Sequence, residues 1–305
     1  MYKKYLISLI ICLITLILVS CGTENEIETE ERGTIYLSGN GVTIMCPDGE
    51  IGEIGVIDGV AYEVVDRSLL IQRLDEGKDL SKVCVSNVID MDRLFEDSEF
   101  NQPIGNWDVS SVIRMGWMFV NSQFNQPIGN WDVSSVEQMG GMFSRSVFNQ
   151  PIGNWNVRSV EDMGGMFGFS EFNQPIGNWD VSSVKQMGWM FAQSTFNQPI
   201  GNWDVNSVEQ MSGMFENSPF NQPIGDWNVR FVTNMRYMFR GSEFNQPIGD
   251  WNVGSAEFME WMFHSSDFNQ DISTWCVSNI PSEPTNFSTE APLTDVNKPV
   301  WGTCP

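Results

Sequence analysis

Residues 124–147 read FNQPIGNWDVSSVEQMGGMFSRSV, and this 24-residue phrase recurs along most of the chain. The phenylalanine that opens it returns at the same interval from position 100 to position 268, and its tryptophan returns from 107 to 275. A fixed period of about 20 to 50 residues is typical of proteins whose repeats share one core by stacking. The sequence therefore predicts one continuous stack of copies, which we term rungs, rather than several domains.

The two halves of a rung show different spacings of apolar residues. In 128–133, Trp131 and Val133 alternate with polar residues, which is the period of a β-strand. In 136–144 the apolar residues follow a helical spacing, after two serines placed as a helix cap. We therefore expect an α/β solenoid of about eight rungs, each made of a strand and a helix of about two turns.

Stacking should place identical side chains above one another. Parallel strands lie about 4.8 Å apart, so tryptophan should cover tryptophan and phenylalanine should cover phenylalanine. Asn149 and its equivalents should form a column of amides that serves main-chain groups where the chain bends. The segment F-N-Q-P should be a corner, because proline has no N–H to give to a ladder.

The N-terminus has the features of an export signal. Two lysines precede an almost wholly apolar run at 5–19, and Leu-Val-Ser leads into Cys21. This junction resembles the lipobox of bacterial lipoproteins, which implies a signal peptide at 1–20 and a lipidated Cys21. An ordinary signal peptide with an incidental Cys21 is the alternative. Residues 21–33 contain five glutamates and should form an acidic tether.

The charge balance limits the partners. The formal charge is -23, and loss of two lysines and no acid with the signal peptide would leave about -25. A surface this acidic argues against binding to nucleic acid or anionic lipid, which requires basic patches. It also serves solubility, which is the simpler explanation.

Cysteine usage suggests disulfide bonds at both ends of the repeats. Of six cysteines, one lies in the signal and one is Cys21. The remaining four can pair in three ways, and locality in the sequence favours Cys46–Cys84 and Cys276–Cys304. A metal site is the alternative, but the chain has a single histidine and no C-x-x-C spacing.

The repeats are expected to be capped at both ends. Residues 34–83 contain short β-type runs with turn signals and one helical segment near 68–76, so they should form a β-rich N-terminal cap. The repeat region should extend over 84–276. Residues 277–305, rich in proline, serine and threonine, should form the C-terminal cap.

No residue pattern indicates catalysis, a cofactor or a metal. His264 is the only imidazole and should be solvated at a helix end, and the repeated serines have no partnering histidine. Calcium binding by columns of Asp and Asn remains an alternative, although the chain lacks the glycine-rich calcium repeat.

One repeated position varies sharply in size, and we take it as the candidate ligand-binding position. The residue before the closing Met-Phe is glycine in three rungs and a large aromatic residue in others: Trp117, Trp189, Tyr237 and Trp261. A packed core cannot accept both, so the position should be exposed. Exposed aromatic side chains are common at contacts with proteins and other ligands. The alternative is local packing of each ring over a glycine in the next rung.

The phrase FNQPIGNWDVSSVxxMxxMF resembles the repeat of BspA-like surface proteins, a bacterial family related to leucine-rich repeats. The resemblance covers residues 84–276 and implies a leucine-rich-repeat-like fold, a cell-surface location and, in some members, adhesion. With the lipobox, it favours an outer-membrane lipoprotein that binds proteins or glycans. A structural spacer without a specific ligand is the second hypothesis, and an enzyme is the third. The resemblance brings no catalytic residues.

Overall fold

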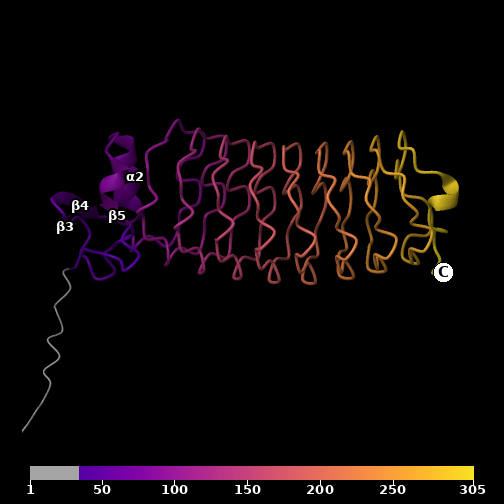
Figure 1. Ribbon diagram of the computed structural model, residues 1–305, viewed down its shortest axis with the longest axis horizontal. Coiled ribbons are helices and arrows are strands. Elements are labelled where there is room, and N and C mark those ends of the chain that lie inside the picture. Colours follow the sequence, from indigo (N-terminus) through magenta and orange to yellow (C-terminus); the bar gives the residue numbers. More distant parts are fainter. Residues whose placement is uncertain (1–33) are drawn as a thin grey trace, which may run out of the picture. The chain divides into compact units, whose positions relative to one another are not determined.

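The computed structural model describes residues 34–305. The predicted signal peptide at 1–20, the lipidation of Cys21 and the tether up to residue 33 therefore lie outside the described residues. Regular elements gather at the N-terminal end of the described chain (Figure 1), and the rungs that follow are built from turns and single β-bridges.

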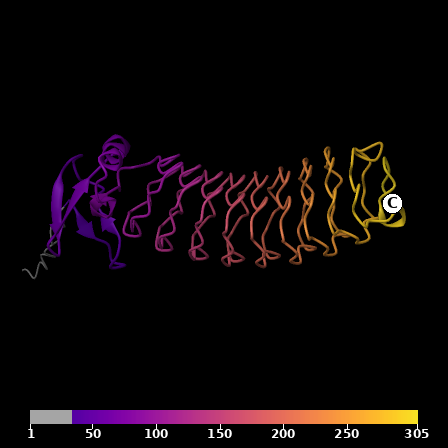
Figure 2. The ribbon, with the colours of Figure 1, turned by 90° about the horizontal axis from the view of Figure 1, so that it is seen from above.

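Two small sheets and one helix form the N-terminal part. Strands β1 (Tyr36–Leu37) and β2 (Ile44–Met45) pair antiparallel. Strand β3 (Ile54–Ile57) pairs antiparallel with β4 (Val60–Val64), which pairs in parallel with β5 (Val83–Cys84). Figure 2 shows these strands beside the first rungs.

Helix α2 (Arg67–Asp75) occupies the segment predicted to be helical. Asp66 caps it by accepting a hydrogen bond from the Leu69 N–H at 2.8 Å. Arg73 in its last turn forms an ion pair with Glu63 of β4 at 2.6 Å, which fixes the helix against the sheet. The 3₁₀ helix η1 (Leu80–Lys82) then leads into β5.

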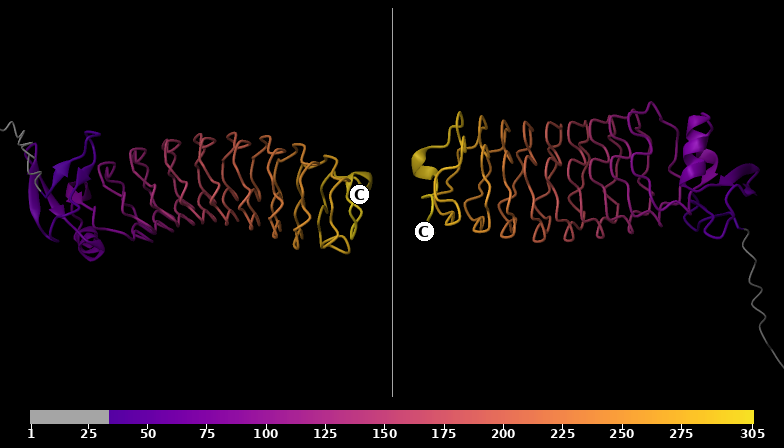
Figure 3. Two further views of the ribbon diagram at one scale, coloured as in Figure 1. Left: turned by 90° about the horizontal axis from the view of Figure 1, so that it is seen from below. Right: turned by 180° about the vertical axis from the view of Figure 1, so that it is seen from behind.

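Successive rungs lie side by side in chain order, as Figure 1 and Figure 3 show from several directions. A parallel β-bridge joins each rung to the next, at eight positions spaced by 24 residues from Asp90 to Phe258. Around this bridge every second N–H donates to the following rung. Gly141, for example, donates to Gly164 at 2.8 Å, and Phe143 donates to Met166 at 2.9 Å.

The prediction of a helix at 136–144 is wrong. This segment contains the bridge residue Gln138 and a series of turns. Gly141 and Arg145 have φ values of 66° and 56°, which are incompatible with a right-handed helix. In a helix, these N–H groups would donate to the carbonyl groups four residues earlier. Here they donate to carbonyl groups of the next rung instead. The apolar spacing is therefore that of consecutive tight turns.

The prediction of a strand at 128–133 is also wrong. Trp131 donates its N–H to the carbonyl of Ile128 at 3.1 Å, which closes a turn at the position where a strand was expected. The adjacent glycine explains how rungs approach closely here, since a Cβ on Gly129 would lie 2.9 Å from the Pro151 carbonyl oxygen. The bridges lie in the other half of the rung.

Identical side chains do stack, and they build the core. Trp131 and Trp155 lie with ring centroids 6.4 Å apart and planes within 4°. Phe143 contacts both Phe148 at 4.1 Å and Phe167 at 5.8 Å, so two phenylalanine columns interlock. The methionines of the rungs are fully buried between these columns. This is the shared core that the repeat predicts.

Polar groups inside the stack are paired between rungs. The Asn125 side-chain oxygen accepts from the Asn149 N–H at 3.0 Å and from the Gln150 amide at 3.1 Å. The Trp155 indole N–H donates to the Ile128 carbonyl at 3.1 Å. The predicted asparagine column at the corner is thus present, with each amide serving the following rung.

The two ends are closed by cysteine pairs and by continued hydrogen bonding. Cys46 pairs with Cys84, and Cys276 pairs with Cys304, with Cα atoms 6.2 and 4.1 Å apart. These are the pairs that locality favours. After the last rung, residues 285–289 accept N–H groups of that rung, and η2 (Asp295–Asn297) follows. Among residues 34–305, no helix has the length and hydropathy to cross a membrane.

Candidate functional site: an aromatic and glycine face

The slot before the closing Met-Phe has a left-handed backbone in every rung from Arg93 to Trp261. Its φ is 66° at Gly141 and 65° at Gly165, where glycine adopts this conformation without steric cost. The four predicted ligand-binding residues adopt it too, with φ values of 59°, 61°, 59° and 63° at Trp117, Trp189, Tyr237 and Trp261. Each aromatic residue there costs about 1–2 kcal/mol relative to glycine. Strain of this kind gathers at functional sites.

Trp117 and Trp189 combine exposure with local packing. They are 46% and 41% exposed, so the slot is open to solvent as predicted. Each ring also covers a glycine of the next rung, because a Cβ on Gly141 or Gly213 would lie within 2.8 and 2.6 Å of it. Trp117 and Trp189 are therefore exposed, as predicted, and each also packs over a glycine of the next rung, which was the alternative.

Tyr237 and Trp261 are half-buried in a continuous aromatic strip. Tyr237 lies 6.4 Å from Trp261, and on its other side 6.1 Å from Trp189, two rungs away. Arg240 lies against both rings, at 5.8 and 5.4 Å, and pairs with buried Glu216 at 2.9 Å. Burial raises the pKa of Glu216, and the Arg240 guanidinium opposes that rise.

A groove of about 570 Å³ separates Trp117 from Trp189. Glycines form its floor, and we call it the glycine groove; it is lined by Trp117, Gly141, Ser144, Arg145, Asp162, Gly164, Gly165, Gly168, Phe169, Gln186, Gly188, Trp189, Gln210 and Ser212. At its centre, a Cβ on Gly165 would meet nothing within 4 Å. The two exposed indoles thus line a groove that glycines keep open between them.

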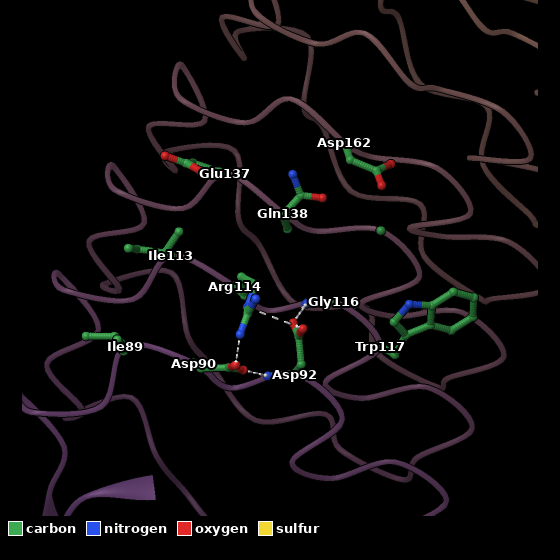
Figure 4. A pocket seen from close by; sticks show the side chains of 11 residues that line it. Ile89, Asp90, Asp92, Ile113, Arg114, Gly116, Trp117, Glu137, Gln138 and Asp162 are labelled. Atoms are coloured by element: carbon green, nitrogen blue, oxygen red, sulfur yellow. Dashed lines mark hydrogen bonds and ion pairs between the residues drawn. The ribbon is translucent and has the colours of Figure 1, made fainter.

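A more polar pocket of about 660 Å³ lies on the other side of Trp117 (Figure 4). Arg114 forms an ion pair with Asp90 there and lies 3.7 Å from Asp92. Burial raises the pKa of Asp90, but hydrogen bonds from the Asp92 N–H and the Arg114 guanidinium lower it further, so that it lies below its ordinary value. These charges are already paired, which favours a structural role.

The prediction that His264 is solvated is wrong. Its side chain is 16% exposed and stands edge-on to Trp261, with ring centroids 4.6 Å apart. Its Nδ1 is buried and has no hydrogen-bond partner among residues 34–305. The position lies within a turn instead of at a helix end, and the ring packs against the neighbouring indole. Residues 34–305 contain no cluster of three His, Cys, Asp or Glu side chains able to hold a metal ion.

Sequence analysis found the four aromatic residues but missed the groove between two of them. Gly140, Gly164 and Gly188 occupy a slot that holds Ser212, Arg236 or Glu260 in later rungs. Its backbone does not require glycine, since none of these three has a positive φ. A run of glycines at a position that tolerates larger residues was the available signal.

Comparison with known proteins adds a family assignment. A family model described as "Mycoplasma protein of unknown function, DUF285" matches three times in tandem, over residues 68–171, 146–239 and 195–298. Together these matches span more than half of the chain. The chain belongs to this family. The DUF285 matches overlap along the rungs, as expected for a tandem repeat protein, and they do not name BspA-like proteins. No curated protein and no solved structure shows significant similarity to the chain.

Proposed function

We propose that this protein is a non-catalytic, surface-anchored recognition module that binds a protein or glycan through its aromatic and glycine face. The observation that carries the proposal is the left-handed backbone of Trp117, Trp189, Tyr237 and Trp261. Sister rungs hold glycine at the same slot, so the fold does not require these rings. Because each ring costs stability at this slot, contact with a ligand is the reason we propose for its presence.

The anchoring is part of the same proposal and rests on sequence. The apolar leader and the Leu-Val-Ser-Cys junction favour lipidation at Cys21, which would hold the rungs at a bacterial outer-membrane surface. The acidic segment 21–33 would separate them from the lipid headgroups. The strongly acidic composition favours partners other than nucleic acid.

We further propose to class the fold as a leucine-rich-repeat-like solenoid of the BspA-like kind. The 24-residue bridges, the stacked ring columns and the closed ends support this class. The short helix per rung that such a fold would include is replaced here by turns.

A binding panel with a four-site variant tests the proposal. The full-length protein would be assayed against matrix proteins and oligosaccharides, beside a variant with Trp117, Trp189, Tyr237 and Trp261 all changed to Ala. We expect at least one ligand whose binding is lost in the variant while its circular dichroism and melting remain close to wild type. Phe231→Ala, which removes a 49% exposed ring outside this slot, is the matched control.

Two results would count against recognition. Early melting of the four-site variant would mean that the rings mainly pack. Unchanged binding, or no binding by either protein, would favour a spacer whose near-identical rungs supply length alone.

A further inference from the structure

We propose that the glycine groove binds a linear, uncharged polysaccharide that stacks on Trp117 at one end and on Trp189 at the other. The inference rests on the proposed recognition role of the aromatic face and specifies its ligand. It is carried by four features of the groove, which are its length, its floor, its polar wall and its charge.

The length of the groove calls for an extended ligand. Trp117 and Trp189 are three rungs apart, and rungs joined by parallel bridges are separated by about 4.8 Å, which gives about 14 Å along the stack. Both indoles lean over the glycine of the following rung, so this separation is retained between the rings. A ligand that uses both rings must therefore be stiff and several units long. Pyranose chains offer apolar ring faces at regular intervals.

The floor of the groove argues against a peptide ligand. A peptide that binds as an added strand needs free main-chain donors and acceptors. Here the Gly141 N–H donates to Gly164 and the Gly165 N–H donates to Gly188, each at 2.8 Å, so these groups are already used between rungs.

The wall of the groove offers polar groups suited to hydroxyls. The side-chain amide of Gln186 and the hydroxyl of Ser212 line it and form no hydrogen bond with another residue of the described segment 34–305. Asp162 adds a carboxylate that accepts from the Gly164 N–H at 2.8 Å and keeps further lone pairs. Amides both donate and accept, as sugar hydroxyls do, so the pairing is complementary.

The charge of the groove argues against a polyanion. Its only cationic side chain is Arg145, whose guanidinium lies over the Phe169 ring at 4.2 Å. Asp162 lies in the same groove, and the whole chain carries a formal charge of -23. Sulfated or phosphorylated chains would therefore be repelled. A neutral glycan fits both the charge and the hydroxyl-binding wall.

Calorimetric titration of the full-length protein with defined hexasaccharides tests the inference. The uncharged probes are β-1,4-linked glucose, N-acetylglucosamine and mannose, and the anionic probe is a heparin fragment. We expect one uncharged probe to bind and the heparin fragment not to bind. Trp117→Ala and Trp189→Ala should each weaken that binding by about tenfold. The disaccharide of the same sugar should bind far more weakly, because it cannot reach both rings.

Two further variants separate the groove from the rest of the face. Gly164→Arg should abolish binding by filling the floor, and it should fold, because Arg236 occupies the equivalent position three rungs later. Phe231→Ala removes a 49% exposed ring that lies outside the slot and outside the groove lining, and it should bind within about twofold of wild type.

The outcomes distinguish this inference from the proposed function. If only heparin or a matrix protein binds, and the four-site variant loses that binding, recognition holds and the neutral glycan is wrong. Glycan binding that depends on Tyr237 and Trp261 but not on Trp117 would also overturn the groove assignment. Absence of any binding that depends on these four rings would overturn both.

Discussion

The interior columns and the left-handed slot obey opposite rules, although both recur every 24 residues. In the interior, tryptophan, phenylalanine and methionine return almost unchanged in each rung and are buried. In the slot, glycine alternates with tryptophan and tyrosine, and exposure reaches 46% at Trp117.

The difference follows from what each side chain contacts. An interior ring such as Trp155 stacks on rings of both neighbouring rungs, at 6.4 and 6.5 Å, so any change in size is felt on both sides. In the slot, Trp117 lies against Gly141 and the Arg93 guanidinium, yet 46% of it stays exposed to solvent. Interior positions are therefore fixed by packing, while the slot is free to vary with the ligand.

The largest expected effect comes from breaking an interior column. Trp155→Ala should lower the free energy of unfolding by about 3–5 kcal/mol, because it opens a cavity between two stacked rings and removes the indole hydrogen bond to the Ile128 carbonyl. Urea denaturation followed by circular dichroism would measure it. Phe231→Ala is the exposed control, and equal losses in the two variants would contradict the assignment of Trp155 to the core.

A smaller loss is expected from the asparagine column. Asn149→Ala should cost about 1–3 kcal/mol, because the Asn173 N–H and the Gln174 amide lose their acceptor. Asn269→Ala is a matched control at the end of the column, since Asn269 donates its N–H to Asn245 while its own amide accepts no hydrogen bond from residues 34–305. A similar loss of unfolding free energy in both variants would contradict this explanation.

Placing a ring in a glycine slot should give an effect of about 1–2 kcal/mol. Gly165→Tyr should destabilise the protein by this amount, because tyrosine must adopt a φ near 65° there. The fold should persist, since Tyr237 occupies the equivalent slot three rungs later. Tyr237→Gly is the reverse change. If thermal melting shows Gly165→Tyr to be as stable as wild type, the slot carries no strain.

The smallest effect concerns acid stability at the first rungs. The pKa of Asp90 is lowered in the folded protein, so its stabilising contribution is present above its unfolded pKa of about 4 and is lost as the pH falls through the lower folded value. Asp90→Asn should therefore be less stable than wild type at neutral pH by no more than about 1 kcal/mol. This difference should shrink as the pH falls below the unfolded pKa of about 4, in denaturation measured across pH. A difference that grows on acidification would reverse the assigned sign.

The sequence predicted the shared interior better than the shape of a rung. The positions of Trp131, Met139 and Phe143 were sufficient to predict stacked columns, because stacking follows from the period alone. The helix at 136–144 could not be excluded by spacing, since consecutive tight turns also return apolar residues every three or four positions. The alternation of glycine with tryptophan at the slot was the available sign of a positive φ.

Only part of the candidate site was predictable from the sequence. Trp117 and Trp189 could be chosen because their position varies within the chain. The groove between them depends on which rungs are adjacent and on where each ring leans, and only the arrangement of Gly141, Gly164 and Gly165 in space reveals it.

The central claim is that the slot aromatics are kept for contact with a ligand at a cost to stability. The most direct test is the free energy of unfolding of a variant in which Trp117, Trp189, Tyr237 and Trp261 are all changed to Gly. The account predicts a value equal to or above that of wild type, because relief of four left-handed side chains offsets the lost ring contacts. A fall of about 1 kcal/mol or more per site would show that the rings belong to the core and would contradict the account.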